Sequence, residues 1–379
     1  MIEKFLAKNF FNRMDWVLLV ATLPIVGAGL VTMSSFVETD KLFDKQLVWL
    51  LFSLLVFFIF AKIDWRLLNR ADVLAALFIL ACVVLASLFA VGRIRGIKGW
   101  FSLGVISIQP VDFTKIVLIL VLAKYFSRRH VEIADFKHII ISGIYALIPF
   151  SLVFFQPDFG SAAIIFLIWL GMILVSGVSK KHLLYVFLTA VSVVIFLWFF
   201  VFLPYQKERI VSFLNPTRDI QGAGYNAFQS QVAVGSGMLL GKGVGYGTQS
   251  RLKFLPEYQT DFIFAAFAEE WGFVGVLAVF FFFAIIIYRI LANSFVSGNN
   301  FGVLFGVGLA IMLASHFAIN IGMNMGILPV TGITLPFMSY GGSHLLAEYA
   351  GLGILVGLRQ NARAVHRDDI RNEFLGLEV

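Results

Sequence analysis

Charged residues are scarce in this sequence. Asp, Glu, Lys and Arg make up 13% of its 379 residues, whereas 60% are hydrophobic. A soluble domain carries about a quarter charged residues. The few charges also cluster between apolar runs of about 18 residues or more, the length needed to cross a hydrocarbon core. The composition therefore excludes a soluble domain and predicts an integral membrane protein.

Cysteine is almost absent, because Cys82 is the single one in the chain and lies inside an apolar run. One cysteine excludes an internal disulfide framework and a cysteine-based metal site. A nucleotide-binding loop is missing as well. The glycine-rich stretch 235–243 has Ser236 where the pattern needs Gly and Gly243 where it needs Ser or Thr.

Ten apolar segments have the character of membrane spans. They cover residues 16–36, 46–62, 72–91, 111–126, 138–155, 160–177, 183–203, 262–290, 301–327 and 341–358. We read each as a helix, because only helices and closed barrels satisfy the backbone in lipid, and no alternating barrel pattern is present. The sequence predicts an all-α polytopic membrane protein of about ten transmembrane helices, with residues 1–379 as a single integral membrane domain.

Lysine and arginine are more frequent in the connections on the side that holds both termini, which places the N- and C-termini in the cytoplasm. This bias, together with anionic membrane lipids as partners, explains the net charge of +7, so we expect no nucleic-acid partner. No cleavable signal peptide is evident at the N-terminus. The large loop 204–261 between the seventh and eighth spans is then extracytoplasmic, and structured loops of that length are usually functional.

Asp261 ends this loop, directly before the eighth span. Pro256 breaks any preceding helix, and Thr260 or Asp261 could cap the next one. The alternative is a carboxylate held at the membrane–water boundary, where the head group of an amphiphilic substrate would lie. The helix N-terminus would keep it ionised, and closure around substrate would dry it and strengthen it as a base.

Several cations near this aspartate suit a phosphate-bearing ligand. Those in the loop and around the fourth span are Arg209, Arg218, Lys242, Arg251, Lys253, Lys98 and Lys115. Lys115 has two interpretations, because it could pair locally with Asp112 or reach the headgroup level. An ionisable residue within a span is a functional candidate.

Glu269 and Glu270 add acidic groups to the eighth span. On one straight helix Glu269 would lie about 12 Å deeper than Asp261 and on the same face. Such a group must face protein or a water-filled cavity. Pairing with a lysine or backbone amides and a catalytic role both fit the sequence.

Polar residues at intervals of four mark the last two spans. His316, Asn320 and Asn324 form a stripe in the ninth, which indicates interhelical contacts rather than a proton path. His344 and Glu348 in the tenth cannot make a zinc site alone, because zinc needs at least three protein ligands.

Several short blocks resemble the SEDS family (RodA, FtsW and SpoVE). In family order they are 99–101, 108–110 with Lys115 following, 156–160, 224–230, 247–250, 255–264, 326–332 and 335–343. Gly-Thr-Gln-Ser at 247–250 and Ile-Leu-Pro-Val at 327–330 look more like RodA than FtsW. Asp112 departs from the family pattern, in which Glu is common. His344 and Glu348 match no family motif.

The resemblance implies a peptidoglycan glycosyltransferase of the bacterial inner membrane that polymerises lipid II during cell elongation, with a class B penicillin-binding protein transpeptidase as partner. By position, Asp261 matches the essential loop aspartate of the family and is the candidate general base. Together with the cations, the blocks give these candidate substrate-binding residues: Lys115, Lys98, Arg209, Glu257, Gln109, Asp158, Gln229 and Ser339.

No protein metal site is predicted. A pyrophosphate leaving group needs positive charge, which Lys or Arg or a divalent cation, Mg²⁺ or Mn²⁺, could supply. Two rival functions stay open, a lipid II flippase or transporter and a non-catalytic scaffold for the penicillin-binding protein.

Overall fold

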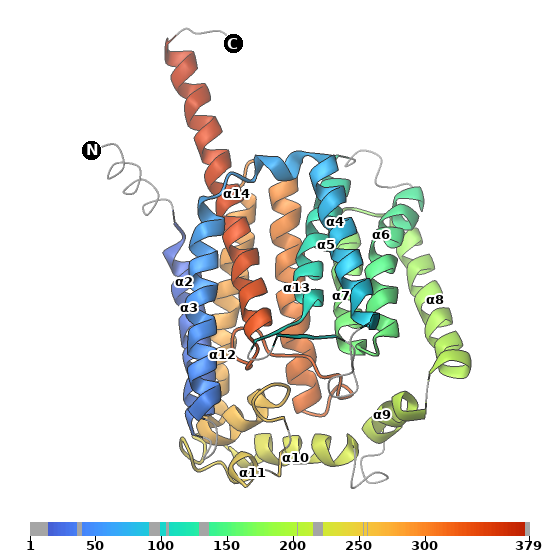
Figure 1. Ribbon diagram of the computed structural model, residues 1–379, viewed down its shortest axis with the longest axis vertical. Coiled ribbons are helices and arrows are strands. Elements are labelled where there is room, and N and C mark those ends of the chain that lie inside the picture. The colour runs from blue at the N-terminus through green and yellow to red at the C-terminus, as the bar shows by residue number, and fades with distance from the viewer. Residues whose placement is uncertain are drawn as a thin grey trace.

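The computed structural model describes residues 14–35, 40–90, 99–103, 106–128, 136–202, 204–214, 223–252, 254–255 and 257–375. Long helices form one bundle (Figure 1). Its longer helices are α2 (Trp16–Ser34), α3 (Asp40–Lys62), α4 (Ala71–Ser87), α5 (Pro110–Ser127), α6 (Phe136–Phe155), α7 (Phe159–Val175), α8 (Lys180–Phe196), α12 (Ile263–Phe295), α13 (Asn300–Asn324) and α14 (Gly342–Leu375). Short helical turns follow α3, α4 and α8 at Trp65–Asn69, Leu88–Ala90 and Leu197–Val201.

These ten helices occupy the positions of the ten predicted spans, and the helical membrane fold is confirmed. Seven of them, in the described part of the chain, are long and apolar enough to cross a membrane, and α7 is a shorter apolar helix. Helix α5 carries charges in its first and last turns, and α14 continues well beyond its apolar part. The number of membrane crossings therefore stays a prediction.

The described part of residues 204–261 contains three further helices, α9 (Pro204–Leu214), α10 (Ala223–Ser236) and α11 (Thr248–Arg251). They lie across one end of the bundle, opposite the end from which α14 projects (Figure 1). We call the end covered by α9, α10 and α11 the loop end, and the end from which α14 projects the terminal end. A two-stranded antiparallel hairpin, β1 (Phe101–Leu103) and β2 (Ile106–Ile108), leads into α5 and is the one sheet among the described residues.

At the terminal end, Asp15 joins the beginning of α2 to α12 and α14. Its Oδ2 accepts hydrogen bonds from Arg289 Nη2 at 2.6 Å and Asn293 Nδ2 at 2.6 Å, and Arg359 Nη1 lies 3.6 Å away. Asp15 Oδ1 also caps α2 by accepting from the Leu18 amide at 3.1 Å. The first and last long helices therefore meet at the same end of the bundle.

Helix α12 is broken at Gly272, which the sequence did not reveal. Its 33 residues would extend about 50 Å if straight, well beyond a hydrocarbon core of about 30 Å. Gly272 instead has φ +65° and ψ −167°. The amides of Lys242 and Gly243 donate to the carbonyls of Glu269 and Glu270, so the glycine-rich loop fills the break.

Gly272→Ala should therefore destabilise the protein, by about 1–3 kcal/mol from backbone strain alone. A Cβ at this position would also lie 2.2 Å from the Gly241 amide nitrogen. Thermal unfolding of the purified protein in detergent would measure the effect. Gly235→Ala is the matched control, because a Cβ there meets nothing within 4 Å. An equal loss of stability in both variants would contradict the role of the break.

Candidate active site

Asp261 lies in a tight turn between the loop helices and α12. The turn begins at Glu257, whose φ of +48° reverses the chain, and the Glu257 carbonyl accepts from the amides of Thr260 at 3.1 Å and Phe262 at 3.2 Å. The side chain of Asp261 is half-buried. Its Oδ2 faces Gly332, where an added Cβ would sit 3.4 Å away, and Gly332 itself is exposed. A substrate group arriving over Gly332 would meet the carboxylate.

Helix capping does not explain Asp261, contrary to the first interpretation of the sequence. The residue at the N-cap of α12 is Phe262, whose side chain offers no hydrogen bond. The buried amide of Asn324 on α13 serves instead, because its Oδ1 accepts from the Ala265 amide at 3.3 Å. Asp261 is therefore not the N-cap of α12, and the ionised state of its carboxylate stays a prediction.

Two asparagines of the α13 stripe fix the backbone of Asp261. Asn320 Nδ2 and Asn324 Nδ2 each donate to the Asp261 carbonyl oxygen at 3.0 Å, and both side chains are fully buried. Asn320 Nδ2 also donates to the Ile333 carbonyl at 2.6 Å. The predicted interhelical role is confirmed for Asn324, which binds the Ala265 amide of α12, whereas Asn320 binds carbonyls in the segments beside α13. Both asparagines hold Asp261 by its main-chain carbonyl rather than by its carboxylate.

A second turn, residues 335–340, holds the two residues before Asp261. Ser339 Oγ donates to the Thr260 carbonyl at 2.7 Å and accepts from the Leu335 amide at 2.8 Å. The Tyr340 amide donates to the Gln259 carbonyl at 2.9 Å. Ser339 is buried, so the contacts seen here position the loop; its predicted contact with substrate stays a prediction.

Gln109 and Asp158 are brought together near the same segment. Gln109 Nε2 donates to Asp158 Oδ2 at 3.1 Å, and Asp158 Oδ1 caps α7 by accepting from the Ser161 amide at 3.0 Å. A Cβ on Gly160 would lie 2.8 Å from the Thr331 carbonyl oxygen, so this corner packs against residues 331–333, which also border Asp261. The two blocks that contain Gln109 and Asp158 therefore converge on one side of the site.

Lys115 forms the local ion pair that was one of its two interpretations. Its Nζ lies 3.1 Å from Asp112 Oδ1 and 3.2 Å from His316 Nε2, and all three side chains are buried. His344 and Glu348, to which sequence reasoning gave no role, complete the cluster. Their spacing of four residues on one helix was the available signal.

Glu269 and Glu270 belong to the loop rather than to a deep site. Glu269 Oε1 accepts from Lys242 Nζ at 2.6 Å and from the Thr248 amide at 2.9 Å. Glu270 Oε1 accepts from Ser35 Oγ at 2.6 Å and the Gly245 amide at 3.0 Å. The predicted pairing of Glu269 with a lysine and backbone amides is confirmed, while the expectation of one straight helix was wrong, because α12 breaks at Gly272, three residues after Glu269.

Two further predicted site residues, Gln229 and Glu257, lie in the segments between α9 and α12. Gln229 is half-buried on α10, and Glu257 is half-buried with its Oε2 accepting from Thr260 Oγ1 at 3.2 Å. The side chain of Arg209 on α9 and the whole of Lys98 lie outside the described residues.

A metal ion would find few protein ligands here. Within the described ranges, no three His, Cys, Asp or Glu side chains are grouped so that they could hold one. Mg²⁺ is commonly held by one or two carboxylates and substrate phosphates. Asp261 could contribute to such a site only together with the substrate.

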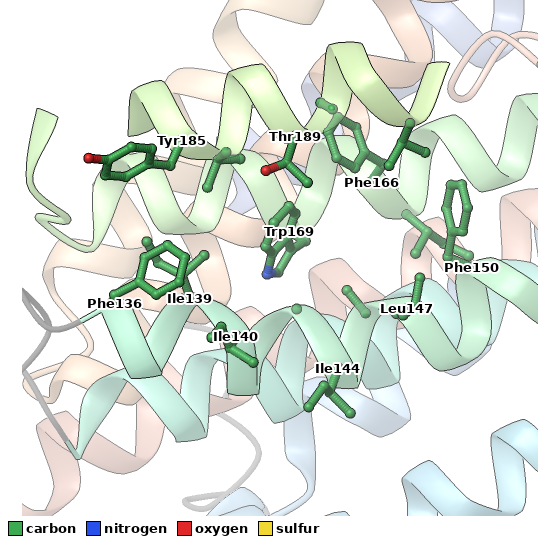
Figure 2. Close-up of a pocket in the computed structure, with 16 residues that line it drawn as sticks. Phe136, Ile139, Ile140, Ile144, Leu147, Phe150, Phe166, Trp169, Tyr185 and Thr189 are labelled. Atoms are coloured by element: carbon green, nitrogen blue, oxygen red, sulfur yellow. The ribbon is translucent and has the colours of Figure 1, made fainter. Parts of the chain in front are cut away.

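A separate hollow lies between α6, α7 and α8 (Figure 2). Its volume is about 400 Å³, and Trp169 projects into it between the helices. Among its lining groups, the Trp169 Nε1–H already donates to Ser142 Oγ at 3.1 Å. Such an apolar lining suits hydrocarbon rather than a sugar or phosphate. This hollow is therefore no candidate for the polar chemistry of glycosyl transfer.

Comparison with known proteins identifies the family. The FtsW, RodA and SpoVE family of cell cycle proteins matches residues 13–364. The peptidoglycan glycosyltransferase MrdB of Escherichia coli K12 is 34% identical over 95% of this chain and 98% of its own length. The stage V sporulation protein E of Bacillus subtilis is also 34% identical, over 92% of this chain and 98% of its own length.

Solved structures agree. A chain of a peptidoglycan synthase complex that coordinates polymerization and crosslinking is 31% identical with a TM-score of 0.78, covering 92% of this chain and 98% of its own. The rod shape determining protein RodA of Thermus thermophilus is 28% identical with a TM-score of 0.67, covering 92% of this chain and 97% of its own. The protein is therefore a multi-pass membrane glycosyltransferase. It belongs to the FtsW, RodA and SpoVE family.

Proposed function

We propose that this protein polymerises lipid II into glycan strands during cell elongation, with Asp261 as the general base. The observation that carries the proposal is the half-buried Asp261 carboxylate at the loop end of a membrane-spanning bundle. Asn320 and Asn324 fix the backbone of this residue by donating hydrogen bonds to its carbonyl oxygen. The protein lies in the bacterial inner membrane. Both termini are cytoplasmic, and the loop end faces outward, where lipid II is displayed.

The reaction needs one base. The donor carries an α anomeric bond to undecaprenyl pyrophosphate and the product bond is β, so a single displacement inverts the centre, in the geometry of inverting glycosidases. The acceptor hydroxyl oxygen attacks the anomeric carbon while the bond to the pyrophosphate oxygen breaks, and its electron pair leaves with the pyrophosphate. The hydroxyl proton passes to the Asp261 carboxylate. Substrate that covers Asp261 would exclude water and strengthen it as a base.

The leaving pyrophosphate requires positive charge nearby. Lys115 and Lys242 already pair with Asp112 and Glu269. We propose Lys98 and Arg209, which the sequence predicts as substrate-binding residues, for this role; Arg218, Arg251 and Lys253 are the remaining candidates among the predicted cations. A divalent cation, Mg²⁺ or Mn²⁺, would supplement them if the substrate brings it. Gln109, Asp158, Gln229, Glu257 and Ser339 complete the proposed binding region.

The partner that we propose is a class B penicillin-binding protein transpeptidase, because a related chain occurs in a synthase complex that combines polymerization with crosslinking. Assignment to elongation rests on the RodA-like motifs and on the MrdB and RodA relatives. The sporulation relative is equally identical in sequence, so the elongation role needs its own test. Restored rod shape in cells depleted of their elongation polymerase would provide it.

A biochemical assay tests the activity. Purified full-length protein in detergent, with its partner, should convert labelled lipid II into glycan strands that a lysozyme-type muramidase digests. No polymer under conditions where a known polymerase is active would overturn the proposal. Lipid II translocation across liposomes without polymer would favour the flippase, and partner binding without either activity would favour the scaffold.

A further inference from the structure

Five buried ionisable side chains from three helices meet beneath the Asp261 turn. Asp112 and Lys115 come from α5, His316 from α13, and His344 and Glu348 from α14. Asp112 Oδ1 lies 3.1 Å from Lys115 Nζ and 3.4 Å from His344 Nδ1, while His344 Nε2 lies 3.0 Å from Glu348 Oε1. The rings of His316 and His344 are 4.8 Å apart between centroids. We call these residues the buried charge cluster.

The charges of the cluster balance if one histidine is protonated. Two carboxylates and one ammonium leave a net negative charge, and an uncompensated buried charge is costly. His344 lies between the two carboxylates with one ring nitrogen toward each, so its imidazolium form faces both. His316 Nε2 faces Lys115 Nζ at 3.2 Å, which suits a neutral ring accepting a hydrogen bond.

One arm of the cluster reaches the turn at 335–340. Glu348 Oε2 accepts from the Phe337 amide at 3.0 Å. Phe337 has φ +61°, a conformation that a bulky side chain adopts only when its surroundings hold it. The same turn carries Ser339 and Tyr340, whose hydrogen bonds hold Thr260 and Gln259. Glu348 therefore supports the residues directly before Asp261.

The other arm runs along α13. His316 is one helical turn, about 6 Å, from Asn320, which binds the Asp261 carbonyl. The pairing of Lys115 with His316 ties this turn of α13 to α5. Both arms thus end on backbone atoms of 259–261.

We propose that His344 and Glu348 are positioning residues for glycosyl transfer, which hold the 335–340 turn and through it the backbone beside Asp261. The effect that we expect on kcat rests on the proposed function. The effect that we expect on the 335–340 turn and the backbone beside Asp261 does not. A misplacement of about 1 Å at a reacting group can cost about a hundredfold in rate. Their loss should therefore lower kcat without weakening substrate binding.

The variants are Glu348→Gln and His344→Gln in the full-length protein with its partner, and the matched control is His138→Gln. His138 is buried on α6, away from the cluster, where its Nδ1 bonds Tyr125 Oη at 2.9 Å. Hydrogen exchange followed by mass spectrometry should show about tenfold faster exchange in 335–340 and 257–262 for both cluster variants, and not for the control. The value of kcat should fall by about 10- to 100-fold, with KM for lipid II within about twofold of wild type. In the double variant, the loss should be clearly less than the sum of the single losses in log kcat.

Wild-type exchange in both segments of both variants would overturn the inference, as would a raised KM at unchanged kcat. If Glu348→Gln does not fold, His344→Gln carries the test, because it leaves the Glu348–Phe337 contact in place. If the wild-type protein forms no polymer but hydrogen exchange still rises in the variants, the proposed function fails. The structural part of the inference, that His344 and Glu348 hold the 335–340 turn, would then still stand.

Discussion

Asp261→Asn is expected to lower the rate of glycan polymerisation by about 10²- to 10⁴-fold, the range that a positioned general base contributes. The substitution keeps the size of the side chain and removes its ability to take the acceptor proton. Asn320 and Asn324 hold the residue through its carbonyl oxygen, so the turn should keep its position. The loss should therefore appear in kcat, measured as polymer formed from labelled lipid II.

The control for this prediction is Glu208→Gln on α9. It removes a carboxylate from the same loop, but Glu208 is exposed. Its rate should match wild type. An Asp261→Asn variant that polymerises as fast as wild type would show that Asp261 is not the base. The flippase would be supported instead by two results together. The wild-type protein would form no polymer, and the Asp261→Asn variant would still translocate lipid II.

Lys115→Met should produce the largest loss of stability, about 3–5 kcal/mol. The methionine fills much of the same space but leaves Asp112 buried without its ammonium partner, and breaking a buried pair costs this much. Unfolding of the detergent-solubilised protein, followed by temperature or denaturant, would measure it. Lys181→Met on the exposed beginning of α8 should change stability little.

The double variant Asp112→Asn/Lys115→Met tests the cause. Removing both charges should restore part of the stability lost in Lys115→Met, because the uncompensated carboxylate is then gone. Restoration would be incomplete, since His344 also faces Asp112 at 3.4 Å. If the two substitutions acted independently, the double variant would be less stable than Lys115→Met by the full stability loss of Asp112→Asn alone. That result would contradict the ion-pair explanation.

Hydropathy predicted the helices well because a membrane constrains them directly. Each long apolar segment must satisfy its own backbone hydrogen bonds, so its helical state follows from local sequence. The exception is α12. Its apolar run continues through Gly272, and the break depends on backbone contacts with the distant loop residues 238–243.

The same limit applies to the site. The motif around Asp261 marked the residue, but capping seemed to explain its position, because Asp and Thr before an apolar run are typical caps. The actual cap comes from Asn324, more than 50 residues later, which no local pattern indicates. Asn324 was read correctly as an interhelical residue, but the shared partner of Asn320 and Asn324, the Asp261 carbonyl in the turn before α12, was unknown.

The sequence by itself therefore determined a helical membrane protein, the position of its helices, its family and the aspartate to examine. These features depend on local composition and short motifs. Only the tertiary structure decided how Asp261 is held, that Lys115 is paired, that Glu269 and Glu270 anchor the loop, and that His344 and Glu348 join a buried charge cluster. Those outcomes depend on contacts between helices, and charge burial is settled only once the helices have packed.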